Sequence, residues 1–233
     1  MDFKEENIVS APCEEAEMKK TQNYKKVVIE DKKTYNFFKR CFDIVVSFLG
    51  LIVLFVPLLI ISLIIVIDSP GASPIYCQER IGKNGKSFKF YKFRSMVPDA
   101  ESMLDSLLSQ NEMTTPVFKI KNDRRITRVG RFIRRTSIDE LPQLWNVLIG
   151  DISLVGPRPP LPREVELYTE YQYQRLLIMP GITCYWQVQP KRNSLSFDEW
   201  VELDLKYIEE RNFFKDLVIL FKTIGAVFGQ EGE

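Results

Sequence analysis

The sequence has no histidine among its 233 residues. This absence excludes every Ser–His or Cys–His nucleophile pair and every zinc site built on imidazole. Cysteine is scarce too, and the four that occur, at positions 13, 41, 77 and 184, lie far apart without a C-x-x-C pair. They are neither a disulfide framework nor a metal knuckle, so a reduced chain facing the cytosol is the simpler interpretation. Any catalytic acid, base or nucleophile must be a carboxylate, lysine, tyrosine or cysteine.

Positive charge is missing from residues 41–79, which contain three acidic residues and no Lys or Arg. The whole chain has a net charge of only +1, yet residues 80–158 carry 15 basic against 8 acidic side chains. Residues 159–233 are acidic instead, with 8 basic against 12 acidic side chains. A basic middle third indicates an anionic partner, and composition does not choose among phosphate groups, lipid head groups and nucleic acid.

One long segment has no charge at all. Residues 44–67 read IVVSFLGLIVLFVPLLIISLIIVI, which is 24 residues. As one helix this segment would be about 36 Å long, enough to cross a hydrocarbon core of about 30 Å. A buried core helix is the alternative, but a helix that is apolar on every face argues against it. A cleaved signal peptide is also disfavoured, because charged and polar residues precede the run and no small-residue cleavage site follows.

Two features argue against an ordinary membrane crossing. Pro57 stands near the middle of the run, where it removes a backbone hydrogen bond and kinks a helix. Basic residues flank both ends: Lys39 and Arg40 precede the run, and a series beginning at Arg80 follows it. Positively charged flanks stay on the cytoplasmic side, so both ends are expected on the same side of the membrane.

We therefore expect a charged tail over residues 1–36 and a re-entrant helix–break–helix over residues 37–69. Ser47 and Ser62 are candidate hydrogen-bond partners for backbone opened at the break. Residues 70–233 would follow as one domain on the cytoplasmic side, a size that can bury a core.

The remaining pattern predicts an α+β fold. Alternating apolar and polar residues at 75–78 and 88–93, around a Gly/Asn turn at 82–86, predict a β-hairpin. Residues 150–159 indicate a strand that runs into a Gly-Pro-Arg-Pro turn. Helices are expected over residues 99–110, 140–149, 163–178, 197–211 and 213–228. The expected fold is a mostly helical monotopic membrane domain with a re-entrant N-terminal helix, a small hairpin or sheet, and interfacial amphipathic helices.

Two adjacent acids, Asp139 and Glu140, stand where the helix over 140–149 begins. A structural role is available, because Ser137 and Glu140 fit an S-x-x-E capping box and first-turn acids favour the helix dipole. A cap at Ser137 would place Pro142 where a backbone donor is needed, whereas a cap at Asp139 would place it harmlessly in the first turn. Spacing alone leaves both a capping and a catalytic role open.

The surroundings of these acids favour phosphate chemistry. Six arginines precede them: Arg124, Arg125, Arg128, Arg131, Arg134 and Arg135. The Gly-Pro-Arg-Pro turn that follows them presents backbone N–H groups and Arg158, which suit a phosphate oxygen. In a chain without histidine, a carboxylate beside a phosphate has two natural roles: it can hold Mg²⁺, or it can attack phosphorus and form an acyl-phosphate.

Several strings, in order along about residues 37–228, resemble the bacterial sugar transferase family, the monotopic phosphoglycosyl transferases. They are Lys39-Arg40-x-x-Asp43, Gln78-Glu79-Arg80-Ile81-Gly82, Tyr91-Lys92-Phe93-Arg94-Ser95-Met96, Arg125-Ile126-Thr127-Arg128-Val129-Gly130, residues 137–143, Asn146-Val147-Leu148, residues 153–159 and Pro180-Gly181-Ile182-Thr183. Each string alone is weak, but their shared order is a specific signal.

The resemblance implies an enzyme that transfers a phospho-sugar from a UDP-sugar to undecaprenyl phosphate and releases UMP. Such a reaction initiates surface polysaccharide or glycoconjugate synthesis at the cytoplasmic face of the bacterial plasma membrane. Asp139 would be the nucleophile that forms a covalent phospho-sugar intermediate, Glu140 its partner, and Mg²⁺ would bridge Asp139 and the diphosphate. Residues 70–233 would be the catalytic domain. Membrane lipid is an expected partner, nucleic acid is not, and a homodimer is left open.

By the same resemblance, further residues are assigned to phosphate and substrate binding: Lys92, Arg94, Arg158, Arg192, Asp204 and Asp216. For the two aspartates, helix solubility is the alternative. The sequence departs from the family, whose members read Gly-Ile-Thr-Gly and then Gln-x-Asn-Gly-Arg-Asn. This chain has GITC at 181–184 and QVQPKRN at 187–193, so the choice of sugar is not predicted.

A competing hypothesis is a non-enzymatic membrane-anchored adaptor that grips anionic lipid or nucleic acid through its basic region. The basic stretch over 119–135 permits this function. It does not explain why Asp139 and Glu140 precede a Gly-Pro-Arg-Pro turn, nor the order of the other strings.

Overall fold

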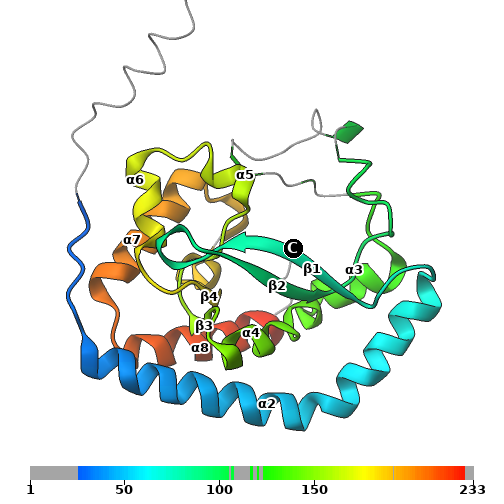
Figure 1. The fold of residues 1–233 in the computed structure, drawn as a ribbon, viewed down its shortest axis with the longest axis horizontal. Helices are drawn as coiled ribbons and strands as arrows, with labels where there is room; N and C mark the ends of the chain where they lie inside the picture. Colours follow the sequence, from blue (N-terminus) through cyan, green and yellow to red (C-terminus); the bar gives the residue numbers. More distant parts are fainter. Residues whose placement is uncertain are drawn as a thin grey trace, which may run out of the picture.

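The computed structural model describes residues 26–104, 106–107, 116–117, 120, 123–190 and 192–228. Most of the expected N-terminal tail, residues 1–25, lies outside this set. The described chain is α+β: a long helix, α2 (Lys33–Asp68), is followed by a β-hairpin, a small parallel strand pair and a series of shorter helices. Figure 1 shows α2 along one side of the domain, beneath α8, α4 and α3, with the hairpin crossing the middle.

Helix α2 is continuous, so the predicted interruption of the helix is wrong. Pro57 lies inside the helix and removes one backbone donor, and α2 curves beneath the domain (Figure 1) while keeping its helical path. Ser47 and Ser62 donate to the carbonyls of Asp43 and Leu58, four residues earlier, at 2.6 and 2.8 Å. These are bonds within an intact helix. Among the residues that the structure describes, α2 is the one helix long and apolar enough to cross a membrane.

Both ends of α2 are fixed to the same domain. Near its start, Lys39 contacts Asp216 at 2.7 Å, and Arg40 donates to the carbonyls of Val147 and Leu148 at 2.6 and 2.8 Å. Beyond Pro57, Ile65 is buried in a cluster with Phe93 and Ile133, against which Leu58 and Ile61 also pack. The basic residues that precede the apolar run are therefore structural contacts as well as charges.

The hairpin is confirmed. Strands β1 (Ile75–Ile81) and β2 (Ser87–Phe93) pair antiparallel, with Ile75 opposite Phe93. The turn, Lys83–Gly85, has positive φ at Asn84 and Gly85, which is the conformation that an Asn-Gly turn adopts readily.

A second, parallel pair joins β3 (Ser153–Val155) to β4 (Gly181–Thr183). The sequence indicated the first of these strands but not the second. The backbone segments at these two strands approach so closely that a Cβ on Gly181 would lie 2.1 Å from the backbone nitrogen of Gly156. Glycine is therefore required at this crossing, which fixes the backbone entering the Gly-Pro-Arg-Pro turn.

Two predicted helices do not form as predicted: the described residues of one contain no α-helix, and the other is divided. Residues 98–103 form turns, with residue 104 a bend and 106–107 a 3₁₀ turn; 105 and 108–110 lie outside the described residues. Ser102 and Ser106 donate to carbonyls three residues earlier, which competes with helix formation. The segment 163–178 divides into α5 (Pro162–Val165), α6 (Glu170–Tyr173) and η5 (Gln174–Leu177), because Thr169 and Gln172 form a capping box that starts a new helix.

The other predicted helices form. They are α4 (Gln143–Ile149), which begins three residues late, α7 (Phe197–Glu210) and α8 (Phe213–Phe228). Helix α8 turns Asp216 and Ile219 inward and leaves Phe214, Phe221 and Ile224 exposed, so one face packs on the domain and another presents apolar side chains. The core beneath the hairpin is centred on Phe90, Val147, Val155 and Tyr207.

Candidate functional site

Asp139 and Glu140 lie in a 3₁₀ turn, η4 (Ile138–Glu140), between α3 (Arg128–Arg135) and α4. Ser137 adopts the left-handed conformation at φ 56° and makes no side-chain capping bond, and α4 starts after Pro142. The capping explanation for these acids is therefore wrong. A non-glycine residue at positive φ is strained, and this one stands directly before the turn that carries both acids.

Glu140 is held by two cations. Its Oε1 lies 3.1 Å from Nζ of Lys92, on β2, and 3.8 Å from Nη1 of Arg158, in the Gly-Pro-Arg-Pro turn. The fully buried amide of Gln143 faces the same carboxylate. Burial opposes ionisation of Glu140, but the charges of Lys92 and Arg158 outweigh it and hold its pKa below the usual range. Glu140 is thus an ionised anchor for the two cations.

Asp139 lies near the same cations but is paired with neither. It is 8% exposed, and no residue of the described chain donates a hydrogen bond to its carboxylate. Burial raises the pKa of Asp139 to about 6, and the nearby charge of Glu140 adds to the rise; Lys92, Arg134 and Arg158 act against it. Two adjacent acids with pKa values moved in opposite directions indicate a division of roles, and Asp139 is the one whose oxygens are uncommitted.

Arg80 holds the arginine turn in place. Its Nη1 donates to the carbonyl of Pro159 at 3.0 Å, and the backbone N–H of Ile81 donates to Pro160 at 2.9 Å. The Arg80 guanidinium and the Lys92 ammonium both lie over the ring of Phe90, at 5.6 and 5.4 Å from its centroid. Arg80 belongs to a string that the sequence analysis quoted, but there it counted only as a basic flank of the apolar run and had no role in the site.

Helix α3 brings Arg134 toward the acids. The helix rests directly on Ser95, because a Cβ on Gly130 would lie 1.9 Å from the Ser95 carbonyl oxygen. Nε of Arg134 donates to Oγ of Ser95 at 2.8 Å, and its charge favours the ionised form of Asp139. The dense arginine run predicted an anionic site, but the sequence could not show which of its members would face Asp139.

The structure brings together Lys92, Asp139, Glu140 and Arg158 and places the other predicted residues elsewhere. Arg94 is buried and donates to the Ser69 carbonyl at the C-terminal end of α2. Arg192 donates to the carbonyl of Gln187, within its own loop, at 3.1 Å.

The two aspartates assigned with them lie in separate clusters. Asp204 pairs with Arg175 at 2.5 Å, both side chains being almost fully buried, and burial raises the pKa of Asp204 to about 6. Asp216 accepts from Tyr35 at 2.8 Å, Tyr207 at 2.7 Å and Lys39 at 2.7 Å. Their assignment to substrate binding stays a prediction.

A metal ion at this site would need ligands from both the protein and the substrate. Within the described part of the chain, no group of three or more Cys, Asp or Glu side chains could enclose an ion. Asp139 nevertheless fits Mg²⁺, because this ion prefers hard oxygen ligands and is usually held by one or two carboxylates together with substrate phosphates.

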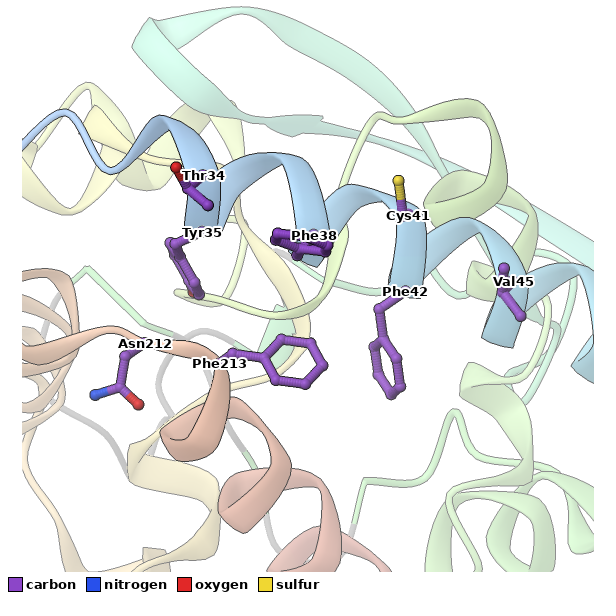
Figure 2. A pocket seen from close by; sticks show the side chains of 8 residues that line it. All are labelled: Thr34, Tyr35, Phe38, Cys41, Phe42, Val45, Asn212 and Phe213. Carbon is purple, nitrogen blue, oxygen red and sulfur yellow. The ribbon is translucent and has the colours of Figure 1, made fainter.

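A separate groove of about 670 Å³ runs between the start of α2 and the start of α8 (Figure 2). Phe42 of α2 and Phe213 of α8 face each other there, with ring centroids 5.5 Å apart, and Phe38 and Val45 extend the lining along α2. The acids at 139 and 140 do not line it. The groove therefore belongs to the apolar helix and not to the charged site.

An unbonded carboxylate beside one lysine and two arginines is a site suited to an anionic ligand, and the domain that carries it is attached to a long apolar helix. A sequence model of the bacterial sugar transferase family matches residues 34–230. The chain belongs to that family.

Curated relatives agree with this assignment. The galactosyl transferase CpsE of Streptococcus agalactiae is 47% identical over 189 residues, covering 81% of this chain and 42% of that protein. The undecaprenyl-phosphate galactose phosphotransferase of Salmonella typhimurium is 44% identical over 205 residues, covering 86% of this chain and 42% of that protein. The exopolysaccharide production protein ExoY of Rhizobium meliloti is 41% identical over 193 residues, covering 81% and 84%. The chain thus spans about two fifths of the first two relatives and most of ExoY.

Proposed function

We propose that this protein transfers a phospho-sugar from a UDP-sugar to undecaprenyl phosphate in two displacements at one site. A carboxylate oxygen of Asp139 attacks the sugar-bearing phosphorus, the bond from that phosphorus to the bridging oxygen breaks, and UMP leaves with the electron pair. A phosphate oxygen of the lipid then attacks the same phosphorus, and its bond to Asp139 breaks. The carboxylate is regenerated and the lipid carries the sugar through a diphosphate.

The observation that carries this proposal is the contrast between the two acids. Glu140 is engaged by Lys92 and Arg158, whereas Asp139 is buried among cations with uncommitted oxygens. A nucleophile needs a free lone pair, and with a pKa of about 6 Asp139 is mostly ionised at neutral pH. Glu140 keeps the cations in place while Asp139 reacts.

Lys92 and Arg158 would supply charge neutralisation. Phosphoryl transfer depends on positioning and electrostatic stabilisation more than on elaborate covalent chemistry. An arginine on a rigid turn can grip two phosphate oxygens at once, and Lys92 adds a point charge from the neighbouring strand. When bound, Mg²⁺ would neutralise charge on the diphosphate, and Asp139 is the residue that would hold it.

We also propose that α2 enters and leaves the membrane by the cytoplasmic face. Support comes from its two ends, which contact one domain through Arg40 on one side of Pro57 and Ile65 on the other. A helix that crossed the bilayer could not keep both sets of contacts. The exposed apolar side chains of α8 and the groove beside Phe42 and Phe213 would then face acyl chains. This seat would let a long isoprenoid acceptor reach the site without leaving the lipid.

The test incubates purified membranes that contain the protein with radiolabelled UDP-sugars and undecaprenyl phosphate. Labelled lipid and released UMP are then measured. Transfer of label from at least one UDP-sugar, with UMP in equal amount, is expected. Chelation of divalent ions should abolish transfer, and added Mg²⁺ should restore it. Release of UDP in place of UMP, or full activity after exhaustive chelation, would contradict the proposed chemistry.

A further inference from the structure

Asn146, in α4, connects this helix to the edge of β2. Its side chain is fully buried and its Oδ1 accepts a hydrogen bond from the backbone N–H of Tyr91 at 3.1 Å. Its Nδ2 donates to the carbonyl of Lys89 at 2.6 Å and to Oδ2 of Asp151 at 2.9 Å. One amide therefore pairs with both a donor and an acceptor on the strand.

These bonds occupy the edge of β2 that faces away from β1. In an antiparallel pair, alternate residues direct their N–H and C=O groups away from the partner strand. Lys89 and Tyr91 are two such residues, so the Asn146 amide takes the place that a third strand would fill. Lys92 is the next residue along this strand, and Glu140 lies in the turn just before the helix that carries Asn146.

We propose that Asn146 is a positioning residue that locks β2 to α4, so that Lys92 and Glu140 remain in contact. The strand supplies the cation, the turn before the helix supplies the acid, and the amide is the polar link that sets their register. The inference rests on the proposed function only for its kinetic consequence, since the positioning itself is a property of the fold.

Asp151 fixes which way the amide points. Its carboxylate can only accept, so the NH₂ group of Asn146 must face it and the oxygen must face Tyr91. The backbone N–H of Asp151 also donates to the Asn146 carbonyl at 3.0 Å, which holds the acid beside the amide. A carboxylate at position 146 would still accept the hydrogen bond from Tyr91, but it would be repelled by the Asp151 carboxylate and by the Lys89 carbonyl oxygen.

The first test measures the contact directly on the full-length protein in detergent. A zero-length carbodiimide joins a lysine amine to a carboxylate it touches, with loss of water, and mass spectrometry quantifies the Lys92–Glu140 product. The Lys215–Glu210 ion pair, at the junction of α7 and α8, serves as an internal reference in the same sample. Asn146→Asp should lower the 92–140 product at least fivefold relative to the 210–215 product. The exposed Asn36→Asp, on α2, makes no contact with either ion pair in the described structure; it is the matched control and should leave the ratio unchanged.

The second test is a double-mutant cycle on transfer activity. If Asn146 acts through Lys92, Asn146→Asp should lower kcat at least tenfold in wild type but by less than twofold in the Lys92→Met background. A merely structural role would give the same factor in both backgrounds. If Asn146→Asp loses both crosslinks together and so does not fold, Asp151→Asn replaces it, with the same direction expected for the crosslink ratio and the cycle.

An unchanged crosslink ratio, or losses that multiply in the cycle, would overturn the positioning role. A wild type that crosslinks normally but transfers no UDP-sugar would contradict the proposed function instead. In that case the crosslink ratio of the Asn146 variant still decides the inference.

Discussion

Nζ of Lys92 lies 3.1 Å from Oε1 of Glu140, and this contact joins a strand of the hairpin to the turn that carries Asp139. Because Lys92 pairs with Glu140, the carboxylate oxygens of Asp139 stay free of hydrogen bonds within the described chain. Lys92→Met should remove the charge while keeping most of the side chain's volume. We expect kcat/KM for the UDP-sugar to fall about a hundredfold or more, as when a preorganised electrostatic group is removed from an active site.

The control for that substitution is Lys86→Met. Lys86 is exposed beside the turn of the same hairpin and contacts neither acid in the described structure. The activity of the Lys86→Met variant should stay within twofold of wild type. Equal activities of the two variants in steady-state assays would contradict a role for Lys92.

The pH dependence of transfer should report Asp139. Its pKa is raised to about 6, chiefly by burial, and only the ionised form can attack phosphorus. The direction follows: kcat/KM should be level above about pH 7 and should fall tenfold for each pH unit well below 6. An initial-rate profile from pH 5 to 8 measures it, and a flat profile down to pH 5 would count against Asp139 as the reacting base form.

Arg158→Lys should be costly although the charge is kept. The Gly-Pro-Arg-Pro turn is held by Arg80, so the guanidinium is presented at a fixed angle to the site. A lysine offers a point charge and cannot reproduce a bidentate contact with phosphate. We expect at least a tenfold loss in kcat/KM, whereas Arg163→Lys, on α5, should have little effect. An Arg158→Lys enzyme with wild-type kinetics would remove this residue from the site.

Local patterns were sufficient for much of the fold. The Asn84–Gly85 turn and the residue patterns of α7 and α8 each have a short-range cause, and these elements formed as predicted. The apolar run formed a helix, but without the predicted break. The errors occurred where other contacts decide. Pro57 lies inside α2 without interrupting it, and Thr169 starts a new helix inside a segment whose periodicity looked continuous.

The site, too, could be predicted from the sequence only in part. Asp139, Glu140, Lys92 and Arg158 stand in recognisable strings, and the structure gathers all four. Only the family resemblance separated the two acids; the residue pattern could not, because their difference arises from which one Lys92 reaches. It also could not place Asp216, whose partners Tyr35 and Lys39 come from the other end of the chain.

Membrane topology is tested by labelling from outside the cell. In a background with the native cysteines replaced by serine, Lys20→Cys and Gln230→Cys should both resist a membrane-impermeant maleimide in intact cells and react after lysis. Labelling of either one from outside would contradict the re-entrant arrangement. Pro57→Leu should restore the missing hydrogen bond, straighten α2 and expose one end in part of the molecules, whereas Val56→Leu should not.

The central claim is that Asp139 forms a covalent bond to the phospho-sugar. The most direct measurement is intact and peptide mass spectrometry of purified protein incubated with the UDP-sugar alone, without lipid acceptor. We predict that wild type gains the mass of one sugar phosphate on the peptide containing Asp139, and that undecaprenyl phosphate removes it. The substitution Asp139→Asn is isosteric and should leave the fold intact, yet this variant should gain no mass and lose transfer by several orders of magnitude. A variant that kept a tenth of wild-type turnover, or a sugar phosphate found on another residue, would contradict the account.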